Sequence, residues 1–386
     1  QFLPTISPHD ANRVLVACDM TGSYISHDGG ESWRMFNLRG TTRFFVFDPV
    51  EPDTIYAYGI GLWRSTDAGA TWSLVFPDPA TIAGILMPDD HASVTIYSSG
   101  RPAPSMTALA VDPSDSRTLY AAMDGALHVS RDWGATWSRL ESLPGGARQI
   151  YVDPASPADD RTIYVLGTRT VTVRQNGEWR RGPAPEGVSS FTDVSAGFPG
   201  DGEPLVVYGL TAAALWISED GGATWRQTEL NGARLRAVAT SLNHPDRIYL
   251  AYSGLREGGA TWFGVARSDD RGHNWRLVWK ESIRTADNIR EAWLSERFGP
   301  GWGGPPFNLG VAPNDPNVCY GTDYGRTMRT TDGGNTWQAV YSRRVDDGGW
   351  ISTGLDVTTC YGVHFDPFDP KRIFITYTDI GLFRSE

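Results

Sequence analysis

The sequence predicts an all-β protein, and two repeated patterns support this. The first is a short motif that occurs six times, with the form [ST]-x-D-x-G-x-[TSN]-W. Asp oxygens bond local N–H groups and Gly tolerates positive φ, so the motif suits a tight hairpin turn. The Trp then starts the next strand and packs beneath the turn. The copies span residues 26–33, 65–72, 130–137, 218–225, 268–275 and 330–337.

The second pattern is a longer unit that contains the motif. The stretch FFVFDPVEPDTIYAYGIGLWRS (44–65) contains a strand, an Asp-Pro turn, a strand, a short Gly turn and a third strand before the motif. A period of about 40 residues with four strands is typical of a β-propeller blade. We therefore predict one β-propeller over residues 1–386, with seven or eight four-stranded blades and Asp-box turns. The units begin near Phe2, Arg43, Met106, Ala147, Ser190, Leu235, Asn308 and Cys360.

The first and last units leave two arrangements open. The first strand of unit one (2–6) is weak, and unit eight stops after its third strand. Either the two ends combine in a closing blade, or the chain is a fragment of a longer tandem-propeller protein that ends inside a seventh Asp-box. A start at Gln1 is expected of a mature chain whose signal peptide was removed, so we predict a secreted, extracellular or periplasmic protein.

Composition narrows the functional classes. A net charge of −11 argues against nucleic-acid binding. The sequence has no run of 18 apolar residues, so we expect no membrane span. The seven His are scattered without metal-ligand spacing, so we expect neither a metal nor a cofactor. The three Cys (Cys18, Cys319 and Cys360) are expected to be buried thiols, with a Cys319–Cys360 disulfide as the alternative.

Aspartates fall into two groups that the blade pattern separates. Those of the Asp-boxes are expected to be structural turn formers between strands three and four. Four units also carry an Asp between strands two and three, in loops that open on the opposite face: Asp19, Asp124, Asp323 and Asp379. Units one, seven and eight are consecutive if the ring closes, so their carboxylates would converge. Paired carboxylates are what glycoside hydrolysis requires, and their proximity keeps one of them protonated.

Two segments resemble a known family. RVLVACDMTGSYIS in unit one and DPFDPKRIFITYTDIGLFRSE in unit eight are similar to the two catalytic segments of the xyloglucanases, which are tandem-propeller glycoside hydrolases. The resemblance implies an inverting hydrolase of a plant or microbial β-glucan or xyloglucan-like polysaccharide. It makes Asp19 the base and Asp379 the acid, with Asp323 as the substitute partner. It also implies a second propeller domain or chain as a partner.

Three insertions interrupt the period, and long loops in a compact domain are usually functional. They span 77–105, 281–307 and 342–359, and the second contains a stretch (282–298) predicted to be helical. Aromatic side chains beside Gly suit stacking on sugars, so we expect substrate contacts from four of them. The alternative is that the two Trp plug the propeller mouth or pack on neighbouring loops. The four candidates are Tyr24, Trp302, Tyr324 and Trp350.

Two other functions remain open. A non-catalytic propeller that binds a glycan or a peptide, similar to the sortilin type, would use the same loops. A polysaccharide lyase would need a Tyr or His base and an Arg that neutralises a uronate, and such a site demands a basic central pocket. The loops between strands two and three are instead richer in Asp. The lyase candidates are Tyr24, Tyr324, His364 and Arg326.

Overall fold

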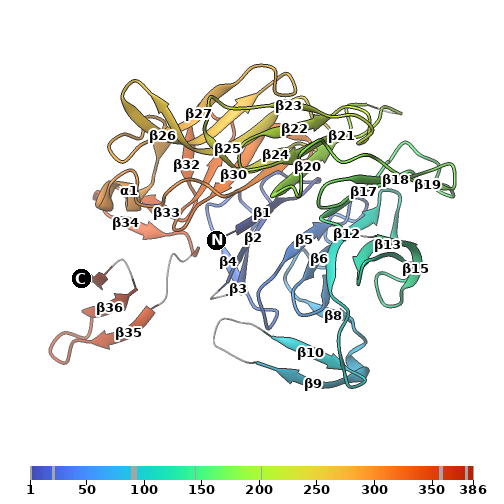
Figure 1. Ribbon diagram of the computed structural model, residues 1–386. Helices are drawn as coiled ribbons and strands as arrows, with labels where there is room; N and C mark the ends of the chain where they lie inside the picture. Colours follow the sequence, from blue (N-terminus) through green and yellow to red (C-terminus); the bar gives the residue numbers. More distant parts are fainter. Residues whose placement is uncertain are drawn as a thin grey trace.

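The chain forms a ring of small antiparallel sheets (Figure 1). The computed structural model describes residues 2–19, 22–87, 94–143, 145–200, 202–355, 360–378 and 381–385. Within these ranges, seven sheets follow one another around a central channel that their first strands line. The prediction of an all-β propeller with four-stranded Asp-box blades is therefore confirmed.

The first three blades each contain four strands in sequence order. Blade 1 comprises β1 (Phe2–Ile6), β2 (Val14–Cys18), β3 (Gly22–Ser26) and β4 (Arg34–Phe36). Blade 2 comprises β5 (Phe44–Phe47), β6 (Ile55–Tyr58), β7 (Leu62–Ser65) and β8 (Ser73–Phe76). Blade 3 comprises β12 (Met106–Asp112), β13 (Asp115–Met123), β14 (Ala126–Ser130) and β15 (Ser138–Ser142).

Blades 4 to 6 repeat this order. Blade 4 comprises β16 (Gln149–Val152), β17 (Ile163–Leu166), β18 (Val171–Gln175) and β19 (Glu178–Arg181). Blade 5 comprises β20 (Asp193–Gly197), β21 (Val206–Leu210), β22 (Leu215–Ser218) and β23 (Arg226–Thr228). Blade 6 comprises β24 (Arg234–Thr240), β25 (Ile248–Glu257), β26 (Ala260–Ser268) and β27 (Arg276–Glu281).

Blade 7 has a fifth strand at its outer edge. It comprises β29 (Asn308–Ala312), β30 (Asp315–Thr322), β31 (Thr327–Thr330) and β32 (Trp337–Ala339). A two-residue strand from the preceding insertion, β28 (Ile289–Arg290), pairs in parallel with β32. The second insertion is thereby joined to blade 7 through the backbone.

The other insertions form small sheets of their own. The first contains the 3-10 turn η1 (Pro79–Thr81) and the strands β9 (Ile82–Leu86), β10 (Thr95–Ser98) and β11 (Arg101–Pro102). The third contains the hairpin β33 (Ser342–Arg344) and β34 (Trp350–Ser352).

The ring closes between blades 7 and 1 through a contact that recurs elsewhere. Between several neighbouring blades, an arginine donates to a backbone carbonyl inside the next Asp-box: Arg34 to Gly69, Arg226 to Arg271 and Arg267 to Gly333. Arg329 Nη1 makes the same contact with the Gly29 carbonyl at 3.0 Å. Blade 1 therefore docks on blade 7 as blade 7 docks on blade 6.

The eighth unit forms a separate sheet, not a closing blade. It comprises β35 (Cys360–Phe365), β36 (Ile373–Tyr377) and β37 (Gly381–Arg384), and it lies apart from the ring in Figure 1. It touches the second insertion through an edge-to-face contact of Phe383 with Trp293, whose ring centroids are 5.9 Å apart. Large apolar side chains of this sheet, such as Phe365 and Phe368, are exposed.

Two sequence expectations need correction. The predicted helix over 282–298 is reduced to α1 (Trp293–Phe298), because Glu291 has a φ of +56° and Ala292 offers no side-chain cap. Only Cys319 is fully buried, while Cys18 is half-buried and Cys360 is exposed. All three are free thiols, so the alternative Cys319–Cys360 disulfide is absent.

No helix in the described part of the chain is long and apolar enough to cross a membrane.

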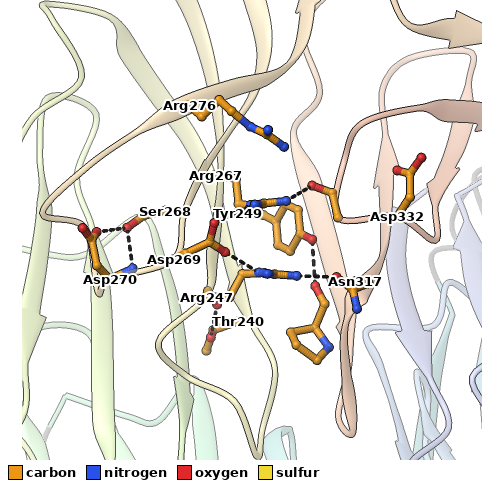
Figure 2. A network of polar contacts seen from close by, with 12 residues as sticks. Thr240, Arg247, Tyr249, Arg267, Ser268, Asp269, Asp270, Arg276, Asn317 and Asp332 are labelled. Atoms are coloured by element: carbon orange, nitrogen blue, oxygen red, sulfur yellow. Dashed lines mark hydrogen bonds and ion pairs between the residues drawn. The ribbon is translucent and has the colours of Figure 1, made fainter.

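The Asp-boxes are closed hydrogen-bond systems. In the box of blade 6, Ser268 Oγ donates to Asp270 Oδ1 at 2.7 Å (Figure 2). It also accepts from the Gly272 N–H at 2.7 Å. The Asn274 N–H donates to the same carboxylate at 2.8 Å. The hydroxyl-to-Asp contact recurs at 2.7 to 2.9 Å in all six boxes. Because the turn saturates these carboxylates, their predicted structural role agrees with their contacts.

Candidate functional site on the loop face of blades 7 and 1

The ring has two faces with different connections. The Asp-boxes lie with the turns between strands one and two, as the Gly29 N–H bonded to the Asn12 carbonyl at 2.8 Å illustrates. We call this the box face. The turns between strands two and three lie with the starts of the first strands, as the Arg43 N–H bonded to the Tyr58 carbonyl at 2.7 Å illustrates. We call this the loop face.

Asp19 lies on the loop face of blade 1. It follows β2, whose Ala17 pairs with Phe2 at the start of β1. Its side chain is exposed, and its contacts with other described residues are weak: the Cys18 thiol lies 3.7 Å from Oδ1, and Thr41 Oγ1 lies 3.5 Å from its carbonyl. An exposed carboxylate whose oxygens are not saturated can accept a proton from water, as a general base must.

Asp323 also lies on the loop face, but it is completely buried. Its Oδ2 accepts from Arg326 Nε at 2.7 Å, and its Oδ1 accepts from the N–H groups of Gly325 and Arg326 at 3.0 and 2.8 Å. Both oxygens are occupied by structural donors. This burial argues against the prediction of Asp323 as substitute partner of the catalytic pair.

The same arginine bonds a second buried carboxylate, Glu281, which the sequence pattern did not reveal. Arg326 Nη1 and Nη2 donate to Glu281 Oε1 and Oε2 at 2.8 and 2.9 Å. Burial raises the pKa of both Glu281 and Asp323, and the guanidinium opposes this. Burial would lower the pKa of Arg326, yet it is raised because the two carboxylates stabilise the cation. The three side chains form a buried ion network, Glu281–Arg326–Asp323.

This network holds the second insertion against blade 7. Arg326 Nη1 also donates to Ser295 Oγ in α1 at 2.8 Å. A Cβ on Gly303 would lie 2.5 Å from Asp323 Oδ1, so the loop after α1 passes directly over the network and requires glycine there. The insertion is therefore fixed by charge-assisted hydrogen bonds from Arg326 to Glu281, where it begins, and to Ser295 in its helix.

The fixed insertion presents aromatic rings on the loop face. Trp302 is half-buried and stacks on Phe298 with ring centroids 5.6 Å apart. Tyr324 is 76% exposed and packs on Phe307 at 5.1 Å. We call these four residues the aromatic surface. A Cβ on Gly325, the residue after Tyr324, would clash with the Trp302 ring, so two of the four predicted substrate-binding residues, Trp302 and Tyr324, lie close together.

The other two predicted substrate-binding residues lie elsewhere. Tyr24 is only 1% exposed within β3, which argues against any contact with a polysaccharide. Both faces of β3 are buried, and Tyr24 packs in a core cluster with residues of blades 6 and 7, whereas the prediction relied on its position after Asp19. Trp350 lies half-buried in the hairpin of the third insertion, with the Arg344 guanidinium 4.5 Å from its ring centroid.

Blades 7 and 1 bring the aromatic surface and Asp19 to the same side of the ring. The Leu3 N–H of β1 donates to Asn308 Oδ1 at 3.0 Å, and Asn308 follows Phe307 of the aromatic surface. Asp19 directly follows β2, the strand that pairs with β1. Neighbouring strands thus connect the carboxylate to the rings without crossing the channel.

Asp379, the predicted acid, lies outside the described residues. The strands on either side of it, β36 and β37, pair through Tyr377 and Gly381. The described residues contain no group of three His, Cys, Asp or Glu side chains arranged as metal ligands.

Known proteins share both the motif and the fold. Residues 24–35 match the BNR/Asp-box repeat. A xyloglucanase of Paenibacillus sp. is 24% identical over 428 residues, covering 96% of this chain and 36% of that protein. The structure of an ancestral GH74 enzyme superposes with a TM-score of 0.65 at 18% identity, over 99% of this chain and 52% of that one.

The chain is an Asp-box β-propeller that is similar to xyloglucanases. It spans about a third of the length of the curated relatives it matches (36% and 38% for two of them). A single-propeller neighbour is YCF48 bound to D1 peptide, with a TM-score of 0.53 and 15% identity, over 100% of this chain and 97% of that one. At such identities the structural neighbours establish the fold alone.

Proposed function

We propose that the chain is part of a secreted glycoside hydrolase that acts on a xyloglucan-like polysaccharide. One observation carries the proposal: an exposed carboxylate, Asp19, shares the loop face with the aromatic surface of the adjacent blade. Aromatic rings bind the apolar faces of sugars, and a free carboxylate beside them can act on the bond between two sugars. The similarity to xyloglucanases over 96% of the chain supports the substrate class.

In this proposal Asp19 activates a water molecule, and Asp379 protonates the glycosidic oxygen. The water attacks the anomeric carbon while the C–O bond to the leaving sugar breaks, and the proton from Asp379 goes to that oxygen. An inverting reaction requires the two carboxyl groups to stand about 6.5–9.5 Å apart, so that the water fits between them. A second propeller, domain or chain, is proposed to complete the cleft, as the relatives' greater length suggests.

The test is a pair of variants, Asp19→Asn and Asp379→Asn, assayed on xyloglucan, other β-glucans and pectic polymers. Loss of a general acid or base should lower turnover by at least about a hundredfold. Asp124→Asn is the matched control, because Asp124 is an exposed aspartate of a two-to-three turn in blade 3, away from the aromatic surface. If a polymer is cleaved and both variants keep the wild-type rate, the assignment is wrong.

Binding without hydrolysis is the second candidate, and one observation favours it. A single propeller of nearly the same length, YCF48, is known bound to a peptide. If the chain binds a glycan or a peptide but cleaves no polymer, this function takes the place of the first. The lyase alternative loses support, because Arg326 is occupied by two buried carboxylates and Tyr24 is buried.

A further inference from the structure

The central channel carries three arginines at one level near its loop-face mouth. The channel has a volume of about 620 Å³ and is lined by the first strands of the seven blades. Its charged lining, within the described residues, consists of Arg43, Arg148, Arg236 and one carboxylate, Asp193. Three cations against one anion contrast with the net charge of −11 of the chain.

The register of the strands places the arginines at equivalent positions in blades 2, 4 and 6. Arg43 precedes Phe44, which pairs with Tyr58, and Arg148 precedes Gln149, which pairs with Leu166. Arg236 occupies a β-bulge before Ala237, which pairs with Ala251. Counted back from the last residue of the first strand, Arg236 lies at the same position as Arg43 and Arg148. Blades 3, 5 and 7 have Thr107, Thr192 and Phe307 at this level, and all six residues line the channel. Arginine and threonine therefore alternate around most of the rim.

None of the three arginines bonds a carboxylate among the described residues. Arg43 Nη1 contacts Ser105 Oγ at 3.5 Å, and Arg148 Nη2 and Nη1 donate to the carbonyls of Phe191 and Thr192 at 2.8 and 3.3 Å. Arg236 has a buried Nε without a hydrogen-bond partner in the described part of the chain. Neutral oxygens orient two of the guanidinium groups, but they do not neutralise their charges.

The Asp193 carboxylate does not neutralise these charges. Its two oxygens accept from the backbone N–H groups of Val194 and Val238, both at 2.9 Å. Burial raises its pKa, and the nearby Arg148 opposes this. Three like charges thus remain on one rim, an arrangement that a bound anion would stabilise.

We propose that this arginine rim binds the carboxylate of a uronic acid residue. The planar guanidinium fork matches a carboxylate, and the alternating threonine hydroxyls offer partners for the hydroxyl groups of a sugar ring. The channel volume exceeds that of a simple inorganic ion and admits a monosaccharide. The choice of a sugar rests on the proposed function, whereas the choice of an anion rests on the rim alone.

The experiment is calorimetric titration of the full chain with a galacturonate trimer, a glucuronate and matched neutral sugars. We expect the uronates to bind, the neutral sugars to bind at least about tenfold more weakly, and the affinity to fall with added salt. Arg148→Met and Arg236→Met should each weaken uronate binding about tenfold or more. Arg139→Met, on the exposed outer strand of blade 3, is the matched control and should bind as wild type.

Two further readouts separate this site from the proposed hydrolysis. Arg236→Met should retain the wild-type melting temperature, because it removes a charge without a carboxylate partner among the described residues. Arg148→Met should melt slightly earlier, because it also removes the hydrogen bonds to the carbonyls of Phe191 and Thr192. Both rim variants should retain wild-type turnover of neutral xyloglucan. Binding of sulfate or of an acidic peptide without binding of uronate would overturn the proposal, and so would uronate binding that the rim variants leave unchanged. Neither result would bear on hydrolysis at Asp19.

Discussion

On the box face six aspartates make nearly identical contacts, whereas on the loop face the aspartates of the two-to-three turns differ from one another. Each box carboxylate receives a hydroxyl and backbone N–H groups from its own turn, as Asp220 does from Ser218 and Thr224. On the loop face Asp323 is buried on an arginine, while Asp19 is exposed. Where every blade must turn in the same way, the contacts repeat. Where insertions enter, the same residue type takes different environments.

The largest effect is expected for the buried ion network on the loop face. Arg326→Met would leave Glu281 and Asp323 buried without their cation, which costs about 3–5 kcal/mol of unfolding free energy. Urea unfolding measures this loss of unfolding free energy. With Arg326 replaced, burial favours the protonated carboxylates, so their folded-state pKa exceeds the unfolded one. The loss of stability relative to wild type should then be smallest at acidic pH and grow as pH rises.

Arg117→Met is the matched control for this prediction. The Arg117–Asp115 pair is largely exposed, with 61% of the arginine side chain accessible, so its loss should cost at most about 1 kcal/mol. Equal losses in the two variants would contradict the buried network.

A smaller loss is expected for one box. Asp220→Ala removes an acceptor from the N–H groups of Ala223 and Thr224 and should lower the unfolding free energy by about 1–3 kcal/mol. Thermal unfolding tests this, and turnover or binding per folded molecule should stay at the wild-type level. A large loss of activity at an unchanged melting temperature would mean that the functional face has been assigned to the wrong side.

Acid should weaken the boxes together. The pKa of Asp67 falls from 3.8 to about 2 because the Thr71 hydroxyl and N–H bond its carboxylate, and the Asn274 N–H and side chain do the same for Asp270. A lowered folded-state pKa gives stability that is complete above about pH 4 and is lost as pH falls towards 2. Unfolding midpoints measured between pH 5 and 2 should decrease. Midpoints that stay constant over this range would contradict the prediction.

The smallest stability effect is expected on the aromatic surface. Tyr324→Ala removes a ring that is 76% exposed, so the unfolding free energy should change by no more than about 0.5 kcal/mol. If the ring stacks on sugar, affinity for xyloglucan oligosaccharides should fall measurably. Phe368→Ala, which removes a 94% exposed ring in the turn between β35 and β36, is the control. The same affinity in both variants would remove Tyr324 from the binding site.

The sequence was informative where structure depends on local contacts. The Asp-box turns could be predicted because each uses residues two and four positions apart, as in Ser218, Asp220 and Gly222. The buried network could not, because Glu281 and Arg326 are 45 positions apart. Its one local sign was the Asp323-to-Arg326 spacing, which is typical of a capped turn as well.

The arginine rim lay within reach of the sequence. Alignment of the units by their second strands puts Arg43, Arg148 and Arg236 at one position in alternate blades. The prediction weighed only the loops between strands two and three, which are rich in Asp, and so missed the basic channel. Asp19 lies opposite the Asp-boxes as predicted, because the unit pattern fixes the direction of each strand.

The most direct test of the account compares one aspartate from each face in a single experiment. Asp19→Asn and Asp220→Asn are compared for both melting temperature and turnover of xyloglucan. Asp19→Asn should keep the wild-type melting temperature and lose at least about a hundredfold in turnover, whereas Asp220→Asn should melt earlier and turn over normally. An active Asp19→Asn variant together with a stable but inactive Asp220→Asn variant would contradict the account.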